Sequence, residues 1–213
     1  MDRTITVTGV GRVMVTPDIA DVRIGIAQTR PTVAEARAAA AQRAEHVVAA
    51  VLSAGVDRAD VRTASLVVQP DIEYTDRTPR VRGHQVNHQY LVTVRDLARL
   101  GAVIDGALAA GATGLDGVSF RNADAAGADD RARVEAIRDA RRRAELLAGE
   151  AGVRVGEVVA IAESTPGSIP RPMAAGARLA LAEAAPTPVE AGTSEVVAAA
   201  TVTFAIGSEP AGS

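Results

Sequence analysis

Residues 5–26 alternate between apolar and polar side chains on both sides of a single proline. Proline has no N–H to donate to a strand ladder, and the pair Pro17-Asp18 is typical of a turn. A period of two places alternate side chains on one face of a pleated strand. The apolar members are Ile5, Val7, Val13, Val15, Ala20, Val22, Ile24 and Ile26. The pattern therefore predicts two strands joined at Pro17 as a β-hairpin.

Two glycines interrupt the apolar face of the first of these strands. Gly9 and Gly11 occupy positions where the alternation would place apolar side chains. A glycine inside a strand indicates a bulge or the close approach of another backbone. The pair also forms half of a dinucleotide-binding fingerprint, but the third glycine is missing and a strand follows where that motif needs a helix. We expect both glycines to serve backbone geometry.

The spacing of these residues resembles the opening signature of the SIMPL-domain family, also called domain of unknown function 541. The matching pattern is Val7-x-Gly9-x-Gly11-x-Val13-x-Val15-x-Pro17-Asp18-x-Ala20-x-Val22. The similarity extends over roughly residues 4–207 and is most specific in the Gly-x-Gly and Pro-Asp-x-Ala parts. The family has no established catalytic residues, so the resemblance implies a structural signature made of Gly9, Gly11, Pro17, Asp18 and Ala20. It also implies assembly into large homo-oligomers and a link to envelope or oxidative-stress physiology.

Three amphipathic helices are predicted after the first two strands. The first follows a capping box formed by Thr32 and Glu35, the second follows Asp96, and the third begins near Asp129. We expect Gly55 to end the first helix in a left-handed conformation. The third helix should bury an apolar stripe made of Val134, Ile137, Ala144, Leu147 and Ala151.

Strands are expected between these helices and at the end of the chain. They are centred on residues 66–74, 86–94, 115–120, 155–161 and 196–206. Because each helix carries only one apolar stripe, each needs a sheet to cover. The pattern predicts an α+β fold, with antiparallel or mixed sheets and helices packed on one face.

A weak internal repeat suggests how the chain is divided. Ala-Gly-Val triplets at residues 54–56 and 151–153 each precede a strand, a polar loop and a second strand. We therefore expect one domain over residues 1–207, built from two related helix-plus-hairpin lobes at about 4–95 and 96–207. Residues 164–192 hold five of the ten prolines and are predicted to be a flexible insertion with a short helix over 173–185, and residues 208–213 a disordered tail.

Composition removes several kinds of chemistry. The chain has no cysteine, and all 23 of its basic residues are arginine, so thiol chemistry and lysine Schiff bases are excluded. The net charge is −3, and two phenylalanines, two tyrosines and no tryptophan leave little for stacking on bases, so no nucleic acid is expected as a partner. Arginines 141–143 lie among acidic residues, and Asp139 with Arg143 has the favourable acid-first spacing of a helical ion pair.

The histidines are the strongest candidates for a polar site. His84 and His88 lie on one predicted strand, where four residues span roughly 13 Å, too far for two ligands of one metal ion. We expect ordinary strand-surface histidines, with no metal, no cofactor and no catalytic residue. An enzyme would instead require His84 or His88 within hydrogen-bonding reach of a carboxylate.

Two functions are consistent with these observations. The leading hypothesis is a non-enzymatic, self-assembling protein whose sheet edges dock with other copies. The alternative is a small-molecule or peptide binding module with a groove between the lobes, near Gly9 and Gly11 and lined by Tyr74, His88 and Tyr90.

The start of the chain suggests a location. Residues 1–5 lead directly into a strand without an apolar leader, and no apolar run is long enough to span a bilayer. We expect a cytoplasmic protein without a membrane span. The alternative is the mature form of a periplasmic or secreted protein.

Overall fold

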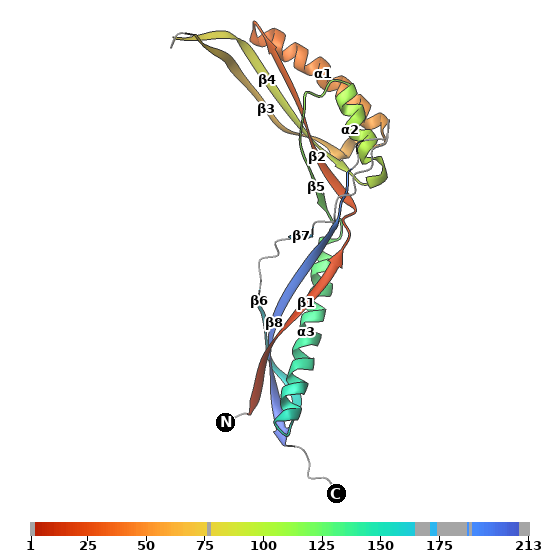
Figure 1. Cartoon of the computed structure of the whole chain (residues 1–213), viewed down its shortest axis with the longest axis vertical. Coiled ribbons are helices and arrows are strands. Elements are labelled where there is room, and N and C mark those ends of the chain that lie inside the picture. The colour runs from red at the N-terminus through yellow and green to blue at the C-terminus, as the bar shows by residue number, and fades with distance from the viewer. Residues whose placement is uncertain (1–2, 76–77, 165–170, 174–186, 188, 209–213) are drawn as a thin grey trace. The chain divides into compact units, whose positions relative to one another are not determined.

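The chain forms two compact units, each built around an antiparallel sheet with helix packed on one face (Figure 1). The computed structural model describes residues 3–75, 78–164, 171–173, 187 and 189–208. The first unit comprises Met1–Thr16, Asp124–Gly176 and Gly192–Ser213, and the second comprises Pro17–Ala123 and Ala177–Ala191. The α+β class predicted from the sequence is confirmed.

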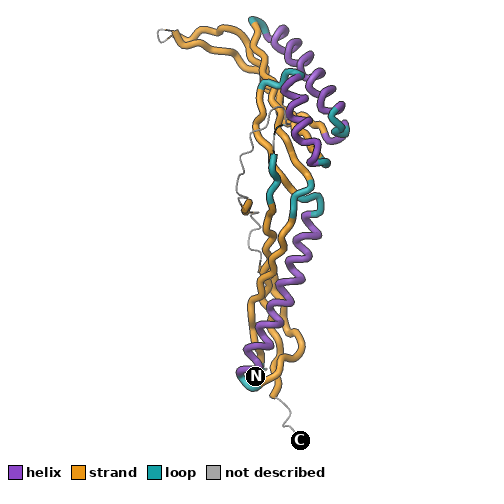
Figure 2. Tube along the Cα trace, turned by 45° about the vertical axis from the view of Figure 1, so that its right-hand side comes forward, coloured by secondary structure: helices purple, strands orange, loops and turns teal. Residues whose placement is uncertain are grey.

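The first unit is a sheet of the order β1-β8-β6, covered by one long helix. Its elements are β1 (Thr4–Val15), α3 (Ala125–Glu150), β6 (Val153–Ser164), β7 (Arg171–Met173) and β8 (Thr193–Ser208). β1 pairs with β8 from Thr4↔Ala205 to Val15↔Ser194, and the short β7 pairs with the start of β8. Figure 2 shows α3 running along the strands of this sheet.

Helix α3 packs on the sheet through alanines spaced every four residues. All of them are at most 1% exposed: Ala128, Ala132, Ala136, Ala140, Ala144 and Ala148. A Cβ added to Gly9 would lie 2.9 Å from the Cα of Ala140 and even closer to the carbonyl oxygen of Ala136. The close backbone approach predicted at Gly9 and Gly11 is therefore confirmed.

The apolar stripe predicted for α3 is only partly correct, because Ala144 is buried and Ile137 packs against the core, whereas two larger members are exposed. Val134 is 49% exposed and Leu147 is 53% exposed, whereas the alanines are buried. Because β1 carries glycines beneath the helix, the two backbones lie so close that only methyl groups fit between them. Val134 and Leu147 therefore face away from the sheet, whereas Ile137 packs against the core.

Polar contacts also connect α3 to β1. The Val10 N–H donates to the Asp139 carboxylate at 3.0 Å, and the Arg143 guanidinium donates to the Thr8 carbonyl at 3.0 Å. The N–H of Val10, and to a lesser degree Arg142 and Arg143, lower the pKa of Asp139. The predicted Asp139–Arg143 ion pair is confirmed at 2.8 Å.

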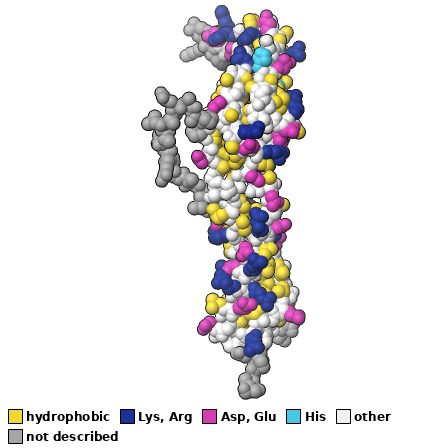
Figure 3. Space-filling model, turned by 90° about the vertical axis from the view of Figure 1, so that its right-hand side faces the viewer, with side chains coloured by type: hydrophobic (Ala, Val, Ile, Leu, Met, Phe, Trp, Pro, Cys, Tyr) yellow, Lys and Arg dark blue, Asp and Glu magenta, His cyan; other side chains and the backbone are white. Residues whose placement is uncertain are grey.

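Basic and acidic side chains are interspersed over the face of the molecule drawn in Figure 3.

The second unit is a sheet of the order β3-β4-β2-β5 with helices over one face. Its strands are β2 (Ile19–Arg30), β3 (Val61–Thr75), β4 (Thr78–Val94) and β5 (Gly114–Arg121). Its helices are α1 (Val33–Ser53) and α2 (Leu100–Ala109), with short 3-10 turns at Arg58–Asp60 and Leu97–Arg99. The capping box at Thr32 and Glu35 is confirmed, as is the long β3–β4 hairpin.

The core of the second unit lies between α1, α2 and the inward face of the sheet. Every second residue of β2 from Ala20 to Ile26 is at most 1% exposed. Val47 and Val51 of α1 and Val103 and Ile104 of α2 complete this cluster. Alternation in β2 therefore directs its apolar side chains to the helices, as predicted.

The predicted N-terminal hairpin and the predicted lobe boundaries both differ from the structure. β1 pairs with β8, and β2 pairs with β4 and β5, so the strands on the two sides of Pro17 belong to different sheets. The boundary between units lies at Thr16 and Ala123 and not near residue 95. Alternation reports which face of a strand is buried but carries no information about its pairing partner.

Several expectations concern residues that lie outside the described part of the chain. These are the helix over 173–185, most of the insertion at 164–192 and the tail after Ser208. Among the described residues, none of the helices has the length and hydropathy required to cross a bilayer.

Candidate functional site

A groove of about 560 Å³ lies between α1 and the strands β3 and β4 of the second unit. Its walls are mainly small apolar side chains, with three charged residues among them. The lining residues are Arg37, Ala40, Ala41, Ala44, Glu45, Val48, Ala49, Leu52, Arg58, Leu66, Val86, His88 and Tyr90. Concave sites with apolar walls and few polar groups are the usual form of ligand sites.

The groove exists because α1 presents alanines to this part of the sheet. Ala40, Ala41 and Ala44 fill little of the space between helix and strands, so an open channel remains beside Leu66. Val86 is buried beneath Ala36 and Ala40. The width of the groove is thus set by short side chains on the helix.

His88 and Tyr90 form the polar part of the groove wall. They are two residues apart on β4 and share a face, and their ring centroids are 4.3 Å apart. His88 Nε2 lies 3.3 Å from the Thr63 hydroxyl. Burial lowers the pKa of His88 and raises that of Tyr90, so both rings favour their neutral forms. Such a pair can stack on an uncharged group and exchange hydrogen bonds with it.

The predicted groove residues are only partly brought together. His88 and Tyr90 line the same groove, but the side chain of Tyr74 lies outside the described residues. Gly9 and Gly11 belong to the first unit and lie beneath α3, so they do not line this groove. The alanine face of α1 was missed as a lining surface, although its i, i+4 spacing was visible in the sequence.

Within the described part of the chain, neither His84 nor His88 has the carboxylate partner that the enzyme hypothesis requires. Nδ1 of His84 lies 3.3 Å from the Pro31 carbonyl oxygen, and the hydrogen-bonding partner of His88 is Thr63. Neither contact involves a carboxylate. Among the residues that the structure describes, no three acidic or histidine side chains are grouped to hold a metal ion.

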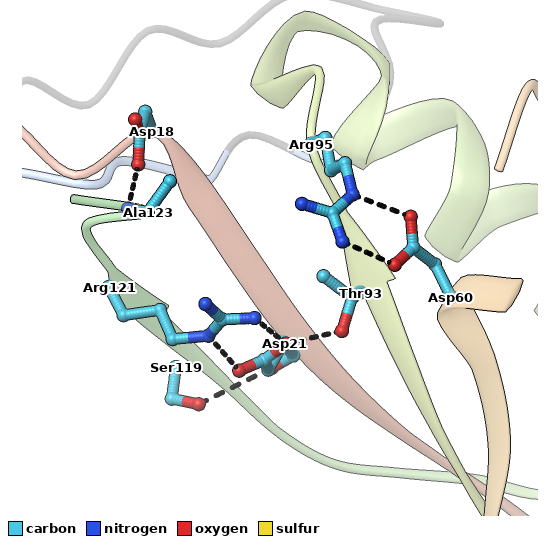
Figure 4. A network of polar contacts seen from close by, with 8 residues as sticks. All are labelled: Asp18, Asp21, Asp60, Thr93, Arg95, Ser119, Arg121 and Ala123. Atoms are coloured by element: carbon cyan, nitrogen blue, oxygen red, sulfur yellow. Dashed lines mark hydrogen bonds and ion pairs between the residues drawn. The ribbon is translucent and has the colours of Figure 1, made fainter. Parts of the chain in front are cut away.

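The signature residues after Pro17 form a polar network at the start of β2 (Figure 4). The Asp18 N–H donates to the Arg121 carbonyl at 3.2 Å, and its carboxylate accepts from the Ala123 N–H at 2.7 Å. Ala20 is fully buried against the helices. Asp18 therefore fixes the end of β5 against β2, which is a structural role.

Asp21 is the residue of this network that sequence reasoning did not single out. Its carboxylate pairs with Arg121 Nε at 2.7 Å and accepts from the Thr93 hydroxyl at 2.7 Å (Figure 4). Nearby, Arg95 holds Asp60 through two bonds of 2.7 Å. The hydrogen bond from Arg121, opposed by burial, lowers the pKa of Asp21. Three strands are thereby joined on the face of the sheet that the helices leave open.

Asp21→Asn is expected to reduce the free energy of unfolding by about 1–3 kcal/mol at neutral pH, because a charge-assisted hydrogen bond is lost. The folded-state pKa of Asp21 lies below that of an aspartate in the unfolded chain. Its contribution is therefore complete above that value and disappears as the pH falls through the folded pKa. Urea unfolding at a series of pH values should show the difference between wild type and variant shrinking in acid.

Asp71→Asn is the matched control for this experiment. Asp71 lies on β3 of the same unit, and its side chain has no ion pair among the described residues. We expect this variant to follow the wild type at every pH. If the difference in unfolding free energy between Asp21→Asn and wild type stays constant down to the most acidic pH, the ionised carboxylate of Asp21 is not what stabilises the sheet.

Comparison with known proteins identifies a matching family model and several relatives of similar sequence. A family model described as SIMPL, protein of unknown function (DUF541), matches residues 5–204. The chain is 30% identical over 210 residues to the 26 kDa periplasmic immunogenic protein of Brucella melitensis, covering 95% of this chain and 84% of that protein. It is also 30% identical over 182 residues to the uncharacterized protein YggE of Escherichia coli K12, covering 85% of this chain and 73% of that protein.

Proposed function

The chain belongs to the SIMPL family of proteins of unknown function, and we propose that it is a non-enzymatic, self-assembling protein whose copies dock through the hairpin β3–β4. The observation that carries this proposal is the exposure of large aliphatic side chains on that hairpin. They are Leu66, Val67, Val68, Ile72 and Val81, exposed by 41–63%. Exposed large aliphatic side chains gathered on one element are typical of interaction sites.

The exposed side chains occupy both faces of the hairpin. Leu66 and Val67 are neighbours in a regular part of β3, so their side chains point to opposite sides of the sheet. Leu66 faces the groove beside α1, whereas Val67 lies on the side without a helix. A partner that covers only one face would leave the other in water.

The distal part of the hairpin also has little support from the rest of the sheet. β4 pairs with β2 only from His84 to Val94, so Thr78–Gly83 pairs with β3 alone. A two-stranded ribbon is only marginally stable in water. β3 is, in addition, an edge strand whose outer backbone groups have no ladder partner in this sheet. Pairing with another chain would satisfy those groups and cover the aliphatic side chains.

A second copy of this chain is the occupant that we favour, because the chain carries a second apolar edge. β6 lies at the edge of the sheet of the first unit and exposes Val158, Val159 and Ile161 by 45–59%. An edge of one copy can therefore meet a different edge of the next copy. Contacts of this heterologous kind build rings or filaments.

Light scattering on the purified chain tests the proposal. We expect the native mass to be a multiple of 21.8 kDa and to fall to that of a monomer in the double variant Val68→Glu/Val81→Glu. The matched control is Leu147→Glu on α3, which is 53% exposed and should leave the mass unchanged. A monomeric wild type, or a double variant that is folded and keeps the native mass, would overturn the proposal.

We propose a location outside the cytoplasm. The relative from Brucella melitensis is named a periplasmic protein, and this name favours the periplasmic alternative over the cytoplasmic location expected from the first residues. Fractionation of cells expressing the native gene would test it. A link to oxidative stress stays a prediction of the family resemblance.

The groove beside α1 supports a second candidate function, the binding of a small apolar ligand. Its volume of about 560 Å³ and the adjacent rings of His88 and Tyr90 are the observations in its favour. Fluorescence of ANS, an aromatic dye that reports apolar surface, should increase with the wild type and less with Ala41→Phe, which fills the groove. Equal fluorescence with both proteins would remove this candidate.

A further inference from the structure

A separate polar pocket of about 400 Å³ lies in the second unit, where the end of β2 meets α1 and the last turn of α2. It differs from the groove described above because its lining is rich in nitrogen donors. The lining residues are Gln28, Arg30, Ala39, Gln42, Arg43, His46, Ala109, Ala110 and Gly111. No acidic residue is among them, although the chain carries 26.

Gln28 is the most informative residue of this pocket. It continues the buried face of β2 after Ile24 and Ile26 and is only 8% exposed, the one polar residue so buried among the described residues. Its side-chain amide has no hydrogen bond within the described part of the chain, and none of its atoms is fully enclosed. Because its atoms remain open to the pocket, the amide can bond there to water or to a ligand. The amide is thus positioned to bind a group in the pocket.

The two arginines of the pocket are also without carboxylate partners in the described residues. Most other arginines of the chain that are described form ion pairs, including Arg95, Arg121 and Arg143. The Arg30 guanidinium donates to the carbonyl of its neighbour Thr29 at 2.7 Å, which leaves further N–H groups. Two unneutralised guanidinium groups near one cavity attract an anion.

Helix geometry brings the remaining donors to the same side. Ala39, Gln42, Arg43 and His46 follow the i, i+3, i+4, i+7 spacing of one helical face on α1. Arg43 lies against the last turn of α2: a Cβ added to Gly111 would be 2.9 Å from its Cδ. Arg43 therefore packs on the C-terminal turn of α2, which fixes where its side chain leaves α1.

We infer that this pocket is a binding site for a compact oxyanion, a phosphate or carboxylate group, held by Arg30 and Arg43 with Gln28 at its base. A guanidinium pairs with either group through two parallel hydrogen bonds. The Gln28 amide donates one N–H from the interior, and His46 and Gln42 supply donors from α1. The inference does not depend on self-assembly, because every residue involved belongs to one unit of one copy.

Isothermal titration of the purified chain with inorganic phosphate and, separately, with sodium acetate tests the site at constant ionic strength. We expect phosphate, acetate or both to bind with one site per chain, and the stronger of the two identifies the class of ligand. Arg43→Gln should weaken binding at least about tenfold, as expected for one lost charged contact of about 1.4 kcal/mol. Gln28→Leu should weaken binding without lowering the unfolding free energy, because leucine extends the apolar face of β2.

Arg23→Gln is the matched control. Arg23 lies on the same strand, is exposed and points to the opposite face of the sheet, so the substitution removes the same charge without touching the pocket. Binding that falls with Arg43→Gln and Gln28→Leu but not with Arg23→Gln supports the site. Absence of binding to both anions, or equal weakening by Arg23→Gln, overturns it.

Discussion

Gly9→Ala is expected to destabilise the first unit by about 3 kcal/mol, the upper end of what overpacking usually costs. The added methyl group would fall on the backbone of α3, 2.9 Å from the Cα of Ala140 and closer still to the Ala136 carbonyl oxygen. Backbone atoms of a helix cannot rotate away as a side chain does, so the whole helix must move from β1. That movement also breaks the bond from Val10 to Asp139.

Gly207→Ala provides the control for this substitution. Gly207 lies in β8 of the same sheet, and a Cβ added there would meet nothing within 4 Å. Urea unfolding followed by circular dichroism should give a lower midpoint for Gly9→Ala and an unchanged one for Gly207→Ala. Hydrogen exchange should show the loss of protection in β1, β8 and α3. Equal midpoints for the two variants would refute the close packing of α3 on β1.

Phe204→Ala is expected to cost about 3–5 kcal/mol, as for other buried phenylalanines. Phe204 is 1% exposed and lies in β8 between Ile5 of β1 and Val158 of β6. The helix above this sheet contributes alanines, among them Ala140 and Ala144. The short side chains of these alanines cannot move into a cavity, so the space left by the Phe204 ring would remain empty.

The only other phenylalanine of the chain is the natural comparison. Phe120 is partly buried at the margin of the second unit's core, so Phe120→Ala should cost clearly less. Both variants can be followed by urea unfolding, with hydrogen exchange assigning each loss to its unit. Equal costs for the two substitutions would mean that the alanine-rich core closes around the cavity.

Much of the local structure could be predicted from the residues alone. Alternation on both sides of Pro17 correctly marked strands and their buried faces, and the capping box at Thr32 correctly placed the start of α1. Gly55 ends that helix with a positive φ of 94°, as expected. Each of these features depends on residues that are close in sequence.

The candidate sites were only partly predictable for the same reason. The i, i+2 spacing of His88 and Tyr90 on a strand predicts that they share a face. It does not predict that α1 forms the opposite wall of the groove. In the sequence, Gln28 is only a polar residue on the otherwise apolar face of β2. Only the folded chain shows that Arg43 from α1 lies at the same pocket.

The residues themselves determined most of the helices and strands, the α+β class and the family, although α3 begins at Ala125 and not near Asp129. Tertiary structure decided which strands pair, so that β1 joins β8 across nearly the whole chain and β2 joins another sheet. It also decided that α3 buries Ala136 and exposes Leu147. The physical reason is that burial depends on the distance between two elements as well as on the hydrophobicity of a side chain. At Gly9 and Gly11 that distance leaves room for the alanine methyl groups of α3 but not for a side chain on β1.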